Sequence, residues 1–360
     1  MLRFSVTLIC AIILFSFSLF GQDKTPKFSN EFLAIGVGAR GMGMSNTQVS
    51  NVNDVSSAYW NPAGLMNIEA KYEAMLMHAE YFAGIAKFDY LSFATPIDSL
   101  NHLAISIIRF AIDDIPDTRF LYDASGRLNY DNIRFFSAAD YAFLVSYARK
   151  LKILNGLKLG GSLKVIHRKV GDFANAWGYG FDFGGQMTAG KWAIGAVIRD
   201  ATGTFNTWSH NTDELNNIFA LTGNEIPKNS IEITLPRMII GISRYFTYKQ
   251  FGLLAAFDND MTFDGRRNVV IKTNTVSIDP HLGLEFDYQR IVFLRFGVGQ
   301  LQQTKDFDGS ESWVFQPNFG LGVKLNNVFI DYALADIGNQ SESPYSHIFS
   351  IKAAFNDKGN

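Results

Sequence analysis

Long segments that alternate between apolar and polar residues limit how this chain can fold more than any other feature. In residues 178–188, GYGFDFGGQMT, the positions of Tyr179, Phe181 and Phe183 alternate with glycine or polar positions. Residues 157–165 and 313–325 repeat this pattern. Successive side chains of a β-strand point to opposite faces, so a period of two gives each strand one apolar and one polar surface. The sequence therefore predicts an all-β fold.

The number and length of these segments favour a membrane barrel over a soluble sandwich. Strands in soluble proteins average about 5–6 residues, whereas a tilted strand that crosses a membrane needs about 9–11. We expect fourteen antiparallel strands, an even number as in most outer-membrane barrels, near residues 71–80, 85–96, 101–111, 135–150, 156–169, 175–189, 190–201, 231–246, 249–258, 272–288, 290–302, 312–325, 327–337 and 345–356.

The connections between these strands alternate in length. Connections such as IDSL, AGK, TYK, YQR and LNN are short, and most of those between them are longer, notably 112–134 and 202–230. Short turns at one end and long loops at the other are typical of transmembrane barrels. The pattern predicts a fourteen-stranded transmembrane β-barrel over residues 71–356.

The N-terminus reads as an export signal. Arg3 precedes an apolar run from Phe4 to Phe20, and the small residue Gly21 follows. This run is short for a membrane anchor, so we interpret residues 1–21 as a cleaved signal peptide and residues 22–70 as a segment preceding the barrel. Cys10 is the only cysteine of the chain, so the mature protein would hold no thiolate nucleophile, disulfide or thiolate metal site.

Residues 36–41, GVGARG, have the spacing of a dinucleotide-binding turn. Such a turn needs a helix after it and then alternating strands and helices. The following residues, MGMSNTQVSNVND, have little helix signal, although Asp54 lies near the expected acidic position. We expect no nucleotide and no other cofactor, and we interpret the glycines as allowing tight turns in a packed segment. A formal net charge of −2 also gives no support to nucleic-acid binding.

A second segment, DVSSAYWNPAGL (54–65), follows this glycine-rich stretch. Together the two resemble the N-terminal region of the PorV/PorQ family, and segments 137–151, 232–244, 281–288 and 329–340 resemble later parts of that family in the same order. The residues that carry the hatch motif are Gly36, Gly38, Arg40, Gly41, Gly43, Trp60, Asn61, Pro62 and Gly64.

This resemblance implies a FadL-like outer-membrane barrel of fourteen strands whose N-terminal segment folds into the lumen as a hatch. It also implies a non-enzymatic role in, or beside, the type IX secretion system of Bacteroidetes-type bacteria, with the translocon or cargo signal domains as partners beside outer-membrane lipid. Gly38-Ala39-Arg40 and Asn61-Pro62-Ala63-Gly64 depart from PorV itself, so the chain looks like a PorV-type paralogue.

Two interpretations of function stay open. The chain could engage secretion partners through its long loops, where Thr212 could cap a short helix carrying Leu215, Ile218 and Phe219. It could instead be a FadL-like transporter of hydrophobic small molecules, with Tyr59 and Trp60 beside the path. For Tyr59 and Trp60 we favour packing within the hatch over contact with a ligand, and the loop helix could equally be one that only packs on the barrel rim.

The sequence contains no pattern that indicates catalysis or metal binding. The six histidines do not pair at H-x-x-H or H-x-x-x-H spacing, and no G-x-S-x-G motif occurs. The acidic loops 258–265 and 306–312 do not match the twelve-residue calcium loop. We therefore predict no catalytic, cofactor-binding or metal-binding residue.

Overall fold

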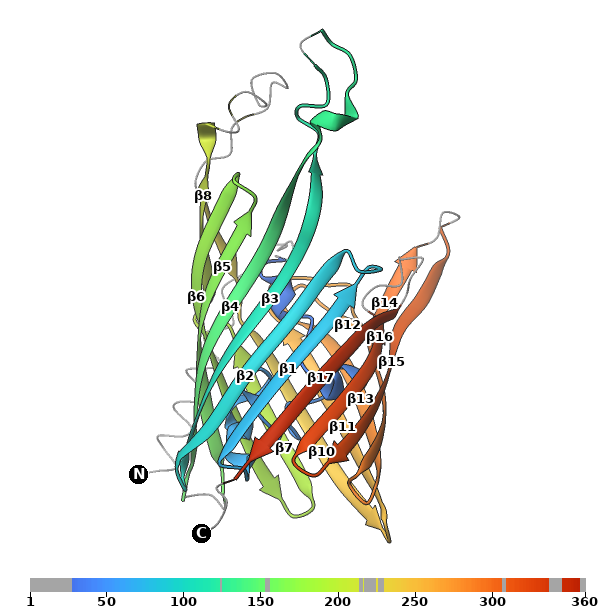
Figure 1. Ribbon diagram of the computed structural model, residues 1–360. Helices are drawn as coiled ribbons and strands as arrows, with labels where there is room; N and C mark the ends of the chain where they lie inside the picture. Colours follow the sequence, from blue (N-terminus) through green and yellow to red (C-terminus); the bar gives the residue numbers. More distant parts are fainter. Residues whose placement is uncertain are drawn as a thin grey trace, which may run out of the picture.

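The computed structural model describes residues 28–123, 125–152, 156–213, 216, 225, 230–305, 309–336 and 345–356. The predicted signal peptide, residues 1–21, and residues 22–27 of the predicted hatch segment lie outside this part. Seventeen strands form one sheet in which every pairing is antiparallel (Figure 1).

The sheet is closed because its first and last strands pair with each other. Strand β1 (Tyr72–Tyr81) lies beside β17 (Tyr345–Phe355), with Tyr72 opposite Phe355. A closed sheet leaves no strand edge with unpaired backbone groups, which is what a sheet in lipid requires. The other strands are β2 (Ala86–Asp98), β3 (Asn101–Asp117), β4 (Arg134–Lys150), β5 (Lys158–Val170), β6 (Ala174–Ala189), β7 (Trp192–Arg199), β8 (Thr204–His210), β9 (Ser230–Thr234), β10 (Arg237–Tyr248), β11 (Phe251–Thr262), β12 (Ile271–Lys272), β13 (Ser277–Tyr288), β14 (Val292–Lys305), β15 (Glu311–Leu325) and β16 (Val328–Asp336).

These strands occupy fourteen positions around the ring, which confirms the predicted fourteen-stranded barrel. Strand β8 continues β7, since both pair with β6, and β9 continues into β10. The short β12 adds only a two-residue pairing beside β13. Seventeen strands thus fill fourteen positions in the barrel wall, because three of them extend or accompany another strand.

Several details differ from the sequence-based prediction. Strand β3 runs to Asp117, into the loop expected at 112–134, and β13 begins at Ser277 although the sequence predicts a strand from residue 272. Residues 204–210, expected in a loop, extend the wall as β8, whose side chains alternate between the faces of the sheet. The strand expected at 231–246 is interrupted at Leu235-Pro236. Proline has no N–H to donate to a ladder, so it falls at a break between β9 and β10.

The two faces of the wall differ in polarity as the alternation predicts. On β15, Phe315, Phe319 and Leu321 are exposed on the outer face, whereas Gln316 and Asn318 are buried on the inner face. An apolar exterior and a polar interior are the surfaces of a transmembrane barrel. Within the described residues, no helix has the length and hydropathy to cross a bilayer.

The segment before β1 lies inside the ring (Figure 1, blue). It contains the short helices η1 (Glu31–Leu33), α2 (Ala39–Gly43), α3 (Ser57–Trp60) and η2 (Pro62–Asn67). Helix α2 contacts β14, β15, β16 and β17, while η2 contacts β3, β4, β5 and β6 across the barrel. Contacts with both sides of the ring place this N-terminal segment, residues 28–70, within the lumen.

The two ends of the barrel are unequal. The start of β1 and the end of β17 lie at the end with short turns, and the opposite rim is uneven because β3, β4, β5, β6 and β8 rise beyond the hairpin of β1 and β2 (Figure 1). The loop between β3 and β4 carries a further short helix, η3 (Tyr130–Asn132). One side of the barrel is therefore a tall wall.

Candidate functional site

The glycine-rich stretch is a tight turn that leads into α2. Gly36 and Gly38 have φ values of 113° and 76°, which favour glycine. A Cβ at Gly41 would lie 2.9 Å from the ring of Trp60. At Gly43 it would lie 2.9 Å from Cα of Gly320 in the wall. These glycines therefore let the N-terminal segment pack closely against itself and against β15.

Tyr59 and Trp60 are buried in the N-terminal segment, 5% and 3% exposed. The Tyr59 hydroxyl donates to the Leu33 carbonyl at 2.6 Å, and the Trp60 indole N–H donates to the Val37 carbonyl at 3.0 Å. Their rings meet edge to face, with centroids 4.8 Å apart. Both rings thus tie two stretches of the segment together, which is the packing role that the sequence left open.

Asn61 connects the segment to the wall. Its Nδ2 donates to the carbonyls of Val49 at 2.9 Å and of Gly185 in β6 at 3.1 Å. Its Oδ1 accepts from Ala63 N at 3.2 Å, and Pro62 occupies the first position of η2. Asparagine before a helix and proline at its first position are both favoured there. Gly64 completes this turn, with no room for a Cβ, which would lie 2.7 Å from Val52 O.

Arg40 belongs to a buried chain of opposite charges. Its Nε lies 2.9 Å from Oε2 of Glu285 in β13, and the same oxygen lies 2.6 Å from Nε of Arg295 in β14. Arg295 also contacts Asp331 in β16 at 2.7 Å. Burial would lower the pKa of the Arg40 guanidinium, but the charge of Glu285 raises it. The alternating charges neutralise groups that would be costly to bury alone.

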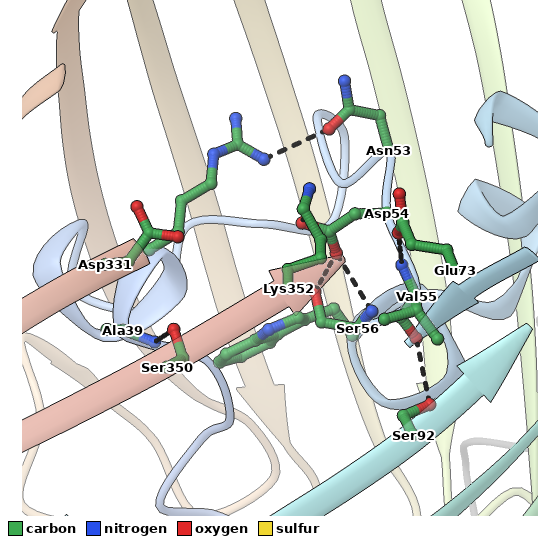
Figure 2. A network of polar contacts seen from close by, with 12 residues as sticks. Ala39, Asn53, Asp54, Val55, Ser56, Glu73, Ser92, Asp331, Ser350 and Lys352 are labelled. Atoms are coloured by element: carbon green, nitrogen blue, oxygen red, sulfur yellow. Dashed lines mark hydrogen bonds and ion pairs between the residues drawn. The ribbon is translucent and has the colours of Figure 1, made fainter. Parts of the chain in front are cut away.

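A second network holds residues 54–56 against the first and last strands (Figure 2). Lys352 Nζ of β17 lies 3.1 Å from Oδ2 of Asp54. Val55 N donates to Oε1 of Glu73 in β1 at 2.6 Å. Burial acts to raise the pKa of the Asp54 carboxyl, but the charges of Lys352 and Arg40 offset this and lower it to about 2. Asp54 is therefore an anion at neutral pH, and it pairs the N-terminal segment with β17.

Two cavities lie on either side of the N-terminal segment. The smaller, about 50 Å³, is lined by Tyr59, Leu33 and the ion pair of Lys164 with Asp182, whose atoms are 2.8 Å apart. The larger, about 810 Å³, opens among the short turns and is lined largely by polar and charged residues, including Arg40. We call this larger cavity the vestibule. The site thus has a packed centre and a polar space at the end of the barrel that carries the short turns.

Sequence reasoning found only part of this site. It identified Arg40. It considered Asp54 only as the acidic residue of a dinucleotide-binding turn, which it rejected, and it did not identify Lys352. The sequence did contain an indication of these charges in the lumen. Charged residues occupy inward positions of alternating strands at Glu285, Arg295, Asp331 and Lys352. The other predicted contacts, Leu215, Ile218 and Phe219, lie outside the described residues. Over the described ranges, no group of three or more His, Asp and Glu is placed to hold a metal ion.

Comparisons with solved structures support the fold. The toluene transporter TbuX of Ralstonia pickettii matches with a TM-score of 0.53 and 12% identity, over 89% of this chain and 99% of its own. The CymD monoaromatic hydrocarbon channel matches at 0.56 and 13%, over 90% and 99%. A FadL homologue of Pseudomonas aeruginosa matches at 0.52 and 11%, over 93% and 99%. At such identities the likeness establishes a common barrel fold.

Sequence comparison adds nothing further: no protein-family model and no curated protein sequence matches the chain.

Proposed function

We propose that this chain is an outer-membrane barrel through which small hydrophobic molecules pass, and that residues 28–70 form the plug that controls their passage. One observation carries the proposal: a closed fourteen-stranded barrel holds its own N-terminal segment in the lumen, in a fold shared with a toluene transporter and a monoaromatic hydrocarbon channel. The apolar exterior fits a place in lipid. Export would use residues 1–21 as a signal peptide.

The contacts of the N-terminal segment support a plug that has to move. Residues 28–70 fill the centre of the ring, so passage needs a displacement of part of this segment. Its polar contacts with the wall include two on β17: Ala39 N donates to Ser350 Oγ at 3.1 Å, and Asp54 pairs with Lys352 two residues further along the same strand. No residue of the proposed path acts as a catalyst in this proposal.

A disulfide between the plug and the wall tests this function. Ala39→Cys with Ser350→Cys places two thiols where the backbone and side chain already touch, and the mature chain has no other cysteine. In cells lacking the native gene, we expect the reduced variant to restore uptake of radiolabelled toluene. Oxidation should abolish that uptake, and each single-cysteine variant should be insensitive to oxidant. Equal toluene uptake with and without the protein would contradict the proposal.

A second candidate rests on the sequence segments that resemble the PorV/PorQ family. In this alternative the chain serves type IX secretion and binds a translocon or cargo signal domains through its long loops, which include the stretch between β3 and β4. Purification of a tagged chain from native membranes in mild detergent, followed by mass spectrometry, tests it. Recovery of neither a translocon barrel nor a signal-domain cargo would reject this alternative.

A further inference from the structure

Basic residues collect at the short-turn end of the barrel. Among the described residues, the turns and strand ends there contain four acidic residues, Glu69, Glu73, Asp98 and Asp287, against nine basic ones: Lys71, Arg149, Lys150, Lys152, Lys158, Lys191, Lys249, Arg290 and Lys324. The whole chain has a formal net charge of −2. The excess of positive charge is therefore a property of this end and does not reflect the composition.

Four of these cations line the vestibule: Lys158, Lys191, Arg290 and Lys324. None of the four forms an ion pair with a carboxylate among the described residues. Arg290 lies over the ring of Tyr245 at 5.3 Å, and Lys324 lies over the ring of Phe329 at 5.1 Å. Lys158 donates to the side-chain oxygen of Asn67. Neutral groups thus contact three of the four side chains, and the nearby carboxylate of Asp287 accepts from the backbone N of Arg290 at 2.9 Å and forms no ion pair with its guanidinium.

Deeper in the same cavity the cations are matched by acids. Arg40, Arg295 and Lys352 each contact a carboxylate within 3.1 Å. At the mouth, by contrast, Lys150 of β4 stands directly opposite Lys158 of β5. Like charges that face each other across a strand pair are destabilising. The unmatched charge is thus concentrated where a molecule from outside the barrel can reach it.

We propose that the vestibule is a docking site for an acidic polypeptide segment of a protein on the short-turn side, which is the periplasmic side for a barrel of this kind. The four cations come from four different turns or strand ends around the mouth, so one small anion could contact only some of them. They line the lumen, which separates them from the headgroups around the outer wall. A flexible segment with several carboxylates complements all four.

The docking site does not depend on toluene passage, and a binding measurement tests it separately. The protein is placed in nanodiscs of zwitterionic lipid, and a fluorescein-labelled peptide of twelve residues alternating Glu and Ser is titrated by anisotropy. A peptide with Gln in place of Glu serves as the uncharged probe. The test variant is K158Q/K191Q/R290Q/K324Q. The matched control, R127Q/R134Q/R266Q/K272Q, removes the same charge from the opposite end, and heat modifiability on gels reports folding of both.

We expect the acidic peptide to bind the native protein and the control variant alike, at least tenfold more weakly to the vestibule variant, and more weakly to all as salt rises from 50 to 300 mM. The Gln peptide should not bind. Equal binding by both variants, or no binding by the native protein at 50 mM salt, would overturn the proposal. So would selective retention of anionic phospholipid by the native protein without peptide binding, which would assign these cations to lipid.

Discussion

At the scale of single residues, the site depends on buried charges that are matched pair by pair. Asp54 and Lys352 are 3% and 11% exposed in their side chains, and each lies where the other compensates it. Removing one member of a buried pair leaves an uncompensated charge, which costs about 3–5 kcal/mol, whereas replacing both by apolar groups is often neutral. The pair therefore positions the plug more than it adds net stability.

Asp54→Asn should lower the free energy of unfolding by about 3–5 kcal/mol, because Lys352 keeps its charge and loses the carboxylate that it contacts at 3.1 Å. The double variant D54N/K352M should recover most of that loss. Urea unfolding of the barrel in lipid vesicles measures both. Equal destabilisation by the single and double variants would show that the pair does not act as a unit.

The pH dependence of this pair follows from the lowered pKa of Asp54, about 2 against an ordinary value of 3.8. Since the folded pKa lies below the ordinary one, the stabilisation is complete above about pH 4 and is lost as the pH falls through about 2. The Asp54 pair should therefore leave the proteolytic protection of residues 28–70 unchanged between pH 5 and pH 7. The carboxylates of Glu73 and Asp258 also hold this segment, by accepting from Val55 N and Val49 N, so the measurement uses the E73Q/D258N variant. Loss of protection in that variant between pH 7 and pH 5 would contradict this assignment.

Gly43→Ala tests a close backbone contact between the N-terminal segment and the wall. The added Cβ would lie 2.9 Å from Cα of Gly320, and neither backbone can move away without shifting α2 or β15. We expect a loss of about 1–3 kcal/mol, as for other overpacked sites, seen as a lower melting temperature. Gly185→Ala is the control, because its Cβ would meet the nearest atom, Leu159 Cδ2, at an ordinary 3.4 Å.

At the scale of elements, alternation along the strands decides which face meets lipid. Leu321 and Leu325 of β15 are 55% and 56% exposed, but Leu321 lies within the strand and Leu325 at its end beside the short turn. Their surroundings should differ although their exposure is the same. Comparing Leu321 with Leu325 therefore tests the effect of depth in the membrane at constant exposure of the side chain.

Leu321→Arg should cost about 2–4 kcal/mol, and Leu325→Arg about 0–1, because the cost of a charge on the lipid face falls from the bilayer centre to its edge. Denaturant titration in vesicles gives both values. The same two variants in detergent micelles report the effect without a fixed bilayer depth. Equal costs in vesicles would place the membrane elsewhere on the wall.

Sequence reasoning could predict these elements because a strand's face depends on local alternation alone. It placed Phe319 and Leu321 on one face and Asn318 on the other, as observed. It could not predict that β8 extends the wall, since a broken strand and a loop look alike without the neighbour that pairs with it. Nor could it pair Arg40 with Glu285, 245 positions away, because barrel closure and the path of the plug set that contact.

At the scale of the whole molecule, the short turns and the long loops should face opposite sides of the membrane. Gly126 and Gly190 are matched sites for an epitope tag, since a Cβ at either would meet nothing within 4 Å. On intact cells we expect antibody to label a tag at Gly126, in the loop between β3 and β4, and not one at Gly190, in the turn between β6 and β7. Labelling of the Gly190 tag alone would reverse the orientation.

The uneven rim seen in Figure 1 makes the two sides of the barrel unequal within the plane of the membrane. Strands β3, β4, β5, β6 and β8 form the tall part of the wall, and the hairpin of β1 and β2 forms a lower part of the rim. If small molecules pass as proposed, they would enter the lumen over the lower part of the rim. Neighbouring membrane proteins beside β1 and β2 would then hinder entry more than neighbours beside the tall part of the wall.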